Sequence, residues 1–141
     1  MQSPVIQALA DLEAAKARVD RDAARVKDEL RAQLVAELLP VLDNLDRSIA
    51  AGGEKSVVEG VRLVRSQLMG VLQKYGLERF DVLGDEFDPR RHDAMSVVDT
   101  ASEALDGVVI DQWEPGYRIG DKLLRPARVV VGRAAIARTA R

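Results

Sequence analysis

The chain has 141 residues, of which 21 are basic and 23 acidic, so its formal net charge is -2. With no cysteine, the sequence excludes a disulfide framework, a thiolate zinc site and a thiol nucleophile. A nearly balanced charge also argues against nucleic-acid binding, because a strongly basic domain is expected for that role.

The first predicted element is a long helix with one narrow apolar seam. Seam residues recur at alternating steps of three and four, which is the spacing that winds two helices together. The remaining surface is nearly all charged or alanine, so the helix cannot form a core alone and needs a partner helix. The seam positions are Leu9, Leu12, Lys16, Val19, Ala23, Val26, Leu30 and Gln33.

After Leu30 the apolar face widens, as it does in helices that pack in a bundle. Pro40 falls inside this stretch and predicts either a kink or a restart of the helix with Pro40 in its first turn. Gly52 and Gly53 then predict the end of the helix.

A second helix is predicted from Ser56 to Tyr75, with Gly76 as its C-terminal stop. Gly60 and Gly70 each cost about 1 kcal/mol relative to alanine. We expect close approach of another helix to offset this cost, the alternative being that the helix tolerates it. Two helices per chain, neither able to make a core alone, predict a homodimer with four helices in one bundle. The expected dimer interface comprises Leu12, Val19, Val26, Leu30, Leu38, Leu42, Leu45, Val61, Val64 and Leu68.

The second half of the chain predicts a small β domain that docks on the helices. Gly116 to Val131 has the pattern of a hairpin, with Gly120 and Asp121 able to reverse the chain and Pro126 suited to a bulge or strand start. The predicted strands are residues 80–83, 95–98, 107–113, 117–119 and 128–131. The expected fold class is therefore α+β: a long N-terminal coiled-coil helix, a dimeric four-helix bundle and a small C-terminal all-β domain.

Candidate chemistry in the β half is sparse. His92 is the single histidine and stands beside Asp93, but without a nucleophile or metal cluster we interpret it as a structural residue in a turn. Trp113 has several basic residues nearby, which fits either a binding surface or ordinary core with solvated strand edges. Few aromatic residues are available for stacking on single-stranded nucleic acid. Nothing predicts a catalytic site, a cofactor or a metal.

In order and spacing, several motifs together resemble the GrpE family, the nucleotide exchange factors of DnaK-type chaperones. The resemblance covers about residues 34–131. It rests on the run Leu38-Leu39-Pro40-Val41-Leu42-Asp43-Asn44-Leu45-Asp46-Arg47, on Glu59-Gly60-Val61, Tyr75-Gly76-Leu77 and Phe87-Asp88-Pro89 with His92, and on Gly116-Tyr117 with Leu124-Arg125-Pro126-Ala127.

The resemblance implies a parallel homodimer that is not an enzyme. The β domain and adjoining helix would engage the chaperone's ATPase domain and open its cleft, so that ADP leaves. The residues that the resemblance places at this contact are Lys122, Arg125, Trp113, Val131, Pro89, Arg47, Lys16 and Arg25. Arg125 could equally brace the hairpin. The alternative function is a coiled-coil dimeric scaffold whose β domain binds another protein.

These patterns divide the chain into a dimerisation region at 1–76, a β domain at 77–133 and a flexible tail at 134–141. The stretch before the seam is shorter than is typical of the family, and the basic cluster of the long helix is thinned to Lys16, Ala17 and Arg18. The resemblance therefore does not settle whether the family's distal-helix roles apply to this chain. No apolar run approaches the roughly 20 residues that span a bilayer, which predicts a soluble, cytoplasmic protein without membrane contact.

Overall fold

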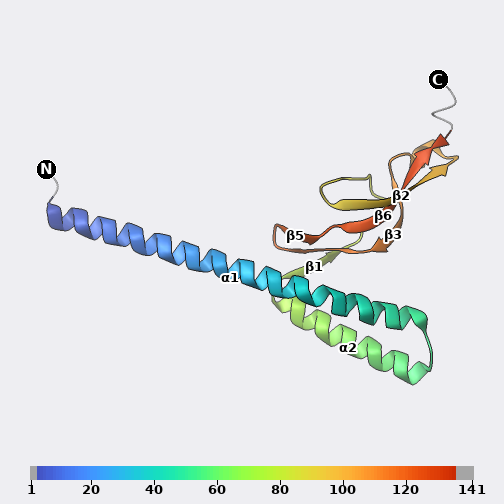
Figure 1. Cartoon of the computed structure of the whole chain (residues 1–141), viewed down its shortest axis with the longest axis horizontal. Helices are drawn as coiled ribbons and strands as arrows, with labels where there is room; N and C mark the ends of the chain where they lie inside the picture. The colour runs from blue at the N-terminus through green and yellow to red at the C-terminus, as the bar shows by residue number, and fades with distance from the viewer. Residues whose placement is uncertain (1–2, 136–141) are drawn as a thin grey trace. The chain divides into compact units, whose positions relative to one another are not determined.

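The computed structural model describes residues 3–135 and has two helices followed by six strands (Figure 1), so the predicted α+β fold class is confirmed. The chain divides into two compact units at Glu37 and Leu38, and each is described by itself. The first unit is helical, and the second contains the end of the long helix, the second helix and all the strands.

The long helix α1 runs from Pro4 to Ala51. Pro40 lies inside it, so the predicted restart of the helix at that residue is wrong. Every residue from 3 to 30 is exposed, including the apolar seam. Leu42, by contrast, is 0% exposed. The helix ends at Ala51, before the two glycines, as predicted.

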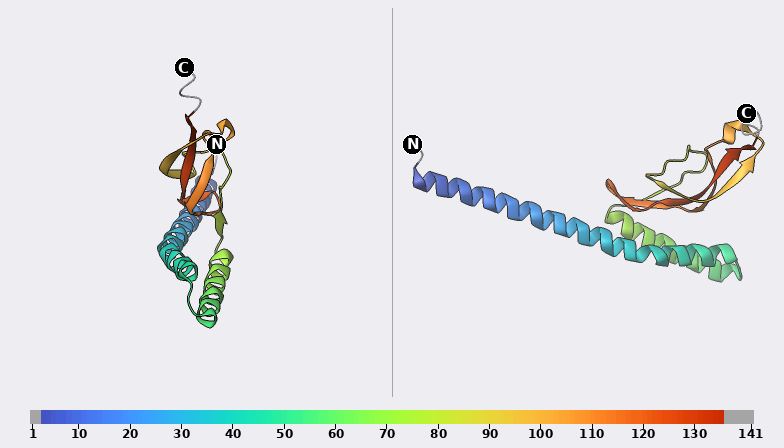
Figure 2. Two further views of the ribbon diagram at one scale, coloured as in Figure 1. Left: turned by 90° about the vertical axis from the view of Figure 1, so that its right-hand side faces the viewer. Right: turned by 45° about the horizontal axis from the view of Figure 1, so that its top comes forward.

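The second helix α2 spans Lys55–Lys74, in agreement with the predicted helix. It lies beside the last turns of α1, residues 38–51, in all three views (Figures 1 and 2). Arg65 of α2 pairs there with Asp46 of α1. Around Gly60 and Gly70, however, an added Cβ would meet nothing within 4 Å. The close approach expected at these glycines is therefore not made within one chain.

The strands form two three-stranded sheets. One has the order β1-β4-β5, with β1 (Leu77–Phe80) and β5 (Lys122–Arg125) both antiparallel to β4 (Gly116–Ile119). The other has the order β2-β6-β3, with β6 (Ala127–Ala134) parallel to β2 (His92–Thr100) and antiparallel to β3 (Val109–Glu114). A short 3₁₀ helix, η1 (Glu103–Leu105), precedes β3.

The predicted strands differ from the observed ones mainly at their boundaries. β1 ends at Phe80, where the first strand was predicted to begin, so that prediction is wrong for residues 81–83. The hairpin is confirmed: Gly120 has φ +55° in the turn between β4 and β5. Pro126 separates β5 from β6, so it stands just before a strand start as expected and marks the passage from one sheet to the other.

The core of the β module lies between these strands. Its buried members are Phe80, Val82, Val109, Ala127, Val129 and Val131, with Phe87 packed against them. Gly116 makes room for the Phe80 ring, because a Cβ on this residue would lie 2.1 Å from the ring Cζ. A side chain at residue 116 would therefore displace Phe80 and open this part of the core.

Candidate functional site

The tip of the β4–β5 hairpin carries an unpaired basic side chain. Ile119 lies opposite Lys122 in the register, with only Gly120 and Asp121 between them. Lys122 is exposed and takes part in none of the ion pairs found within residues 3–135. Its ammonium group is available to an acidic or polar group on another molecule.

Arg125, at the other end of β5, is engaged within the chain. Its guanidinium group makes a two-pronged contact with the Asp43 carboxylate, in which Nη2 lies 2.9 Å from Oδ1. Its Nε donates to the carbonyl oxygen of Pro115 at 3.2 Å, and the group lies 5.0 Å from the centre of the Tyr117 ring. These contacts favour the alternative in which Arg125 braces the hairpin, and the partner contact of Arg125 stays a prediction.

Burial lowers the pKa of the Arg125 guanidinium, but its hydrogen bond and charge attraction to Asp43, with a further attraction to Glu114, outweigh burial and raise the pKa. Burial also raises the pKa of the Tyr117 phenol. The Tyr117 hydroxyl is buried and has no hydrogen-bond partner within residues 3–135. The contact between β5 and α1 thus consists of the Arg125–Asp43 ion pair, whose guanidinium group lies against the buried, uncharged ring of Tyr117.

Trp113 is 56% exposed, so the interpretation as ordinary core is wrong. It lies on β3 at a hollow of about 350 Å³, and Arg47 of α1 lies on the same hollow. Arg47 donates a hydrogen bond to the side-chain oxygen of Asn44, one turn earlier, at 3.1 Å. The structure thus brings together Trp113 and Arg47, two residues that the family resemblance had placed at a partner contact.

Two other residues of the predicted contact have different surroundings. Val131 is 8% exposed and belongs to the core, so we remove it from the candidate surface. Pro89 is exposed in the turn before β2, beside a hollow of about 600 Å³ formed by residues 85–92. It remains a candidate.

His92 is 4% exposed and has a structural part in the same turn. Its Nδ1 accepts a hydrogen bond from the backbone N–H of Asp88 at 3.0 Å. Burial, followed by the charge of Arg91, lowers the pKa of the imidazole, and the carboxylates of Asp88 and Asp85 only partly oppose this. A neutral histidine that holds a turn agrees with the structural role predicted for it.

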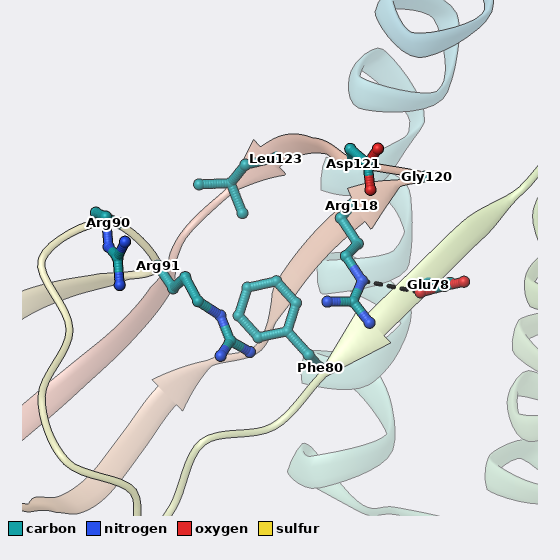
Figure 3. Close-up of a pocket in the computed structure, with 8 residues that line it drawn as sticks. All are labelled: Glu78, Phe80, Arg90, Arg91, Arg118, Gly120, Asp121 and Leu123. Carbon is teal, nitrogen blue, oxygen red and sulfur yellow. Dashed lines mark hydrogen bonds and ion pairs between the residues drawn. The ribbon is translucent and has the colours of Figure 1, made fainter.

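A further hollow, of about 550 Å³, lies by the face of β1 and β4 that carries Phe80 (Figure 3). The guanidinium groups of Arg91 and Arg118 lie 5.0 and 5.9 Å from the centre of the Phe80 ring. Arg118 Nε also donates to Glu78 at 2.8 Å. Because Glu78 and Asp121 also line the hollow, its lining carries charges of both signs. We interpret the arginines as a solvated cover over the Phe80 ring and not as an anion-binding site.

Sequence reasoning did not single out Arg91 or Asp43. Asp43 was noted only as a member of the Leu-Leu-Pro-Val-Leu-Asp run, although an acidic residue in the bundle stretch of a helix is a signal that some basic residue pairs with it. No sequence pattern marks Arg91 as part of a site, because its contact with the Phe80 ring is made only when the chain between the two residues folds back.

The remaining predicted contacts, Lys16 and Arg25, lie in the first unit, on the exposed part of α1. Arg25 is 3.7 Å from Asp22, one turn away, which is an exposed pair of small energetic value. The seam residues around them form a shallow apolar hollow of about 620 Å³, lined in part by Val19, Val26 and Leu30. Of the predicted interface, Leu12 and Val64 are also exposed, Leu38, Leu45, Val61 and Leu68 are half-buried, and Leu42 is already buried within one chain.

Two kinds of site are not found among residues 3–135. No helix there is long and apolar enough to cross a bilayer. In the same range no three residues among His, Asp and Glu are grouped so that they could hold a metal ion. Most of the predicted tail, residues 136–141, lies outside the described residues, and Ala134 is the last residue of β6.

Comparison with known proteins gives one consistent result. The family model described as GrpE matches residues 1–133. A protein named Protein GrpE from Legionella pneumophila (strain Corby) is 36% identical over 129 residues, covering 89% of this chain and 64% of the relative. Proteins of the same name from Aeromonas hydrophila and Treponema pallidum (strain Nichols) are 35% and 36% identical, over 134 and 141 residues. They cover 92% and 93% of the chain, and 70% and 64% of the relatives. The chain thus spans 64% of the length of the first relative.

Proposed function

The chain belongs to the GrpE family, and from this premise we propose that it is a nucleotide exchange factor that binds the ATPase domain of a DnaK-type chaperone and releases ADP. The observation that carries the proposal is that Trp113 and Arg47, both exposed, line one hollow, while the hairpin of the same β module exposes Lys122, which is in no ion pair within residues 3–135. These side chains offer an aromatic anchor and free positive charge, the types most enriched where binding energy concentrates.

The proposed mechanism is differential binding. An exchange factor can open a nucleotide cleft only by the difference between its affinities for the open and closed chaperone. A hairpin fixed by a short turn and tied to a helix offers such a difference, because it fits one spacing of the cleft walls and not the other. ADP then dissociates without any chemical step by this chain.

The proposed division of labour follows the two parts of the chain. Residues 1–76 would form a homodimer through the exposed seam and the bundle, and residues 77–133 would present the contact surface. Lys16, Arg25 and Pro89 are further proposed contacts, all of them exposed. No nucleic acid, membrane or cofactor enters this mechanism, and a cytoplasmic location remains a prediction.

The test follows the release of fluorescent ADP from a DnaK-type ATPase domain after addition of the chain. We expect acceleration at micromolar concentration. Lys122→Glu should lower the acceleration about tenfold, which corresponds to about 1.4 kcal/mol. The matched control is Lys55→Glu at the start of α2, which makes the same charge change away from the hairpin.

No acceleration by the unaltered chain would defeat the exchange-factor proposal and leave the scaffold function. Acceleration that Lys122→Glu and Lys55→Glu leave equally intact would keep the function and remove Lys122 from the contact.

A further inference from the structure

Arg125 directs all three nitrogens of its guanidinium group to partners inside the chain. Both terminal nitrogens contact Asp43, Nε contacts the carbonyl oxygen of Pro115, and the flat face lies on Tyr117. The side chains of Arg125 and Asp43 are 18% and 17% exposed. A partner molecule could therefore reach only a small part of the guanidinium group without disturbing this arrangement.

The pair connects parts that the sequence keeps far apart. Asp43 lies in the last turns of α1, whereas Arg125 ends β5, and Pro115 immediately precedes β4. Among residues 3–135, no other ion pair joins a helix to a strand. One side chain therefore fixes both ends of the hairpin's base to the helix.

A second ion pair joins α2 to the same short segment of α1 that Arg125 contacts. Asp46, three residues after Asp43 and so on the same side of α1, pairs with Arg65 of α2. One short segment of α1 thus holds α2 through one carboxylate and the β module through the other. Both pairs are partly buried. The Arg125–Asp43 contact is also two-pronged, a geometry that adds both energy and directional specificity to an arginine–carboxylate pair.

We propose that the Arg125–Asp43 pair is a positioning device that sets the direction of the β module relative to the end of α1. Arg125 is a positioning residue, and the partner is contacted by Lys122 and Trp113. The hollow that Trp113 and Arg47 share has one wall from α1 and another from β3, so its shape depends on this direction. The consequence for nucleotide exchange rests on the proposed function; the positioning itself does not.

The first experiment measures the direction without any chaperone. Because the chain has no cysteine, Ser66→Cys on α2 and Ser102→Cys before η1 provide two unique, exposed sites for spin labels. The labelled chain is diluted with unlabelled chain, so that pulsed electron resonance reports distances within one chain. We expect a narrow distance distribution for the otherwise unaltered protein.

Arg125→Gln should shift or broaden this distribution, and so should the milder change Asp43→Asn. Arg125→Lys should also broaden it, because a lysine keeps the charge but cannot make the two-pronged contact. The exchanged pair Asp43→Arg with Arg125→Asp should restore a narrow distribution. The matched control is Arg118→Gln, which removes an ion pair within the same sheet and should leave the distances unchanged.

Near-ultraviolet circular dichroism shows whether the β module of each variant stays folded. A folded Arg125→Gln or Asp43→Asn variant with the unaltered distribution would overturn the proposal, and so would an equal broadening by Arg118→Gln.

The ADP-release assay separates the two proposals. If positioning matters for exchange, Arg125→Gln loses most of the acceleration and the exchanged pair regains it. If the unaltered chain accelerates nothing, the exchange function fails while the distance measurement still decides the positioning role.

Discussion

Residues 4–30 and residues 38–135 differ in whether their apolar side chains are buried within one chain. The first stretch is one helix whose apolar seam is exposed at every position. The second buries a set of valines, Leu42 and Tyr117 within a single chain and adds partly buried ion pairs. The contrast teaches that the second region, called the complete region below, has a buried core within one chain although one face of α2 stays exposed, whereas the first region has no core and needs another helix to cover its seam.

The largest expected effect is in the complete region. Leu42→Ala removes a fully buried side chain, so we expect the free energy of unfolding to fall by about 2–5 kcal/mol. Leu30→Ala, on the exposed seam, is the matched change in the other region. Urea unfolding at several protein concentrations measures both. The contrast fails if Leu30→Ala costs as much as Leu42→Ala at every concentration.

The second effect concerns self-association through the seam. Val26→Asp places a charge in the seam, and we expect the dimer dissociation constant to rise at least about tenfold, or about 1.4 kcal/mol. Analytical ultracentrifugation measures mass against concentration. Ala14→Asp adds the same charge outside the seam positions and should change the mass little. Equal effects of the two changes would contradict the seam as the dimer contact.

The third effect is pH dependence in the complete region. The pKa of His92 is lowered in the fold, so its contribution to stability is present above the unfolded pKa of about 6.5 and is lost as the pH falls below it. Between pH 7 and pH 5 the free energy of unfolding of the unaltered chain should fall, by less than Leu42→Ala lowers it. The His92→Asn variant should show a smaller fall over the same pH range. Thermal unfolding across this range measures the effect. Parallel curves would show that other groups cause it.

The smallest effect concerns the face of α2 that stays exposed in one chain. Because a Cβ at Gly60 meets nothing within 4 Å, Gly60→Ala should stabilise the chain by up to about 1 kcal/mol. Chemical unfolding measures this change. A loss of stability that grows with protein concentration would instead show that a second copy packs closely against this glycine.

Local patterns predicted much of the fold. The heptad spacing correctly predicted both helices, and Gly120 with Asp121 correctly predicted the hairpin turn. The parallel pairing of β2 with β6 was not predicted, because its partners are separated in sequence by η1 and three strands. The register of a non-local pair depends on the whole core and leaves no periodic signal in either strand.

The candidate site was predicted less well than the fold, for a related reason. Sequence pattern shows that Arg125, Lys122 and Trp113 are basic or aromatic, but not which of them finds an acidic partner inside the chain. The Asp43–Arg125 contact bridges a helix and a strand, so only the tertiary structure separates a bracing arginine from a free lysine.

The parallel β2–β6 pair also has a consequence for the order of folding. β6 comes last among the strands and is the central strand of its sheet, so neither neighbour can pair until β6 has been synthesised. Helices, which need only local contacts, form earlier and faster. During synthesis the seam of α1 is therefore available to another chain before the β module exists. If two chains pair through this seam as proposed, pairing on the ribosome can precede completion of the proposed contact surface.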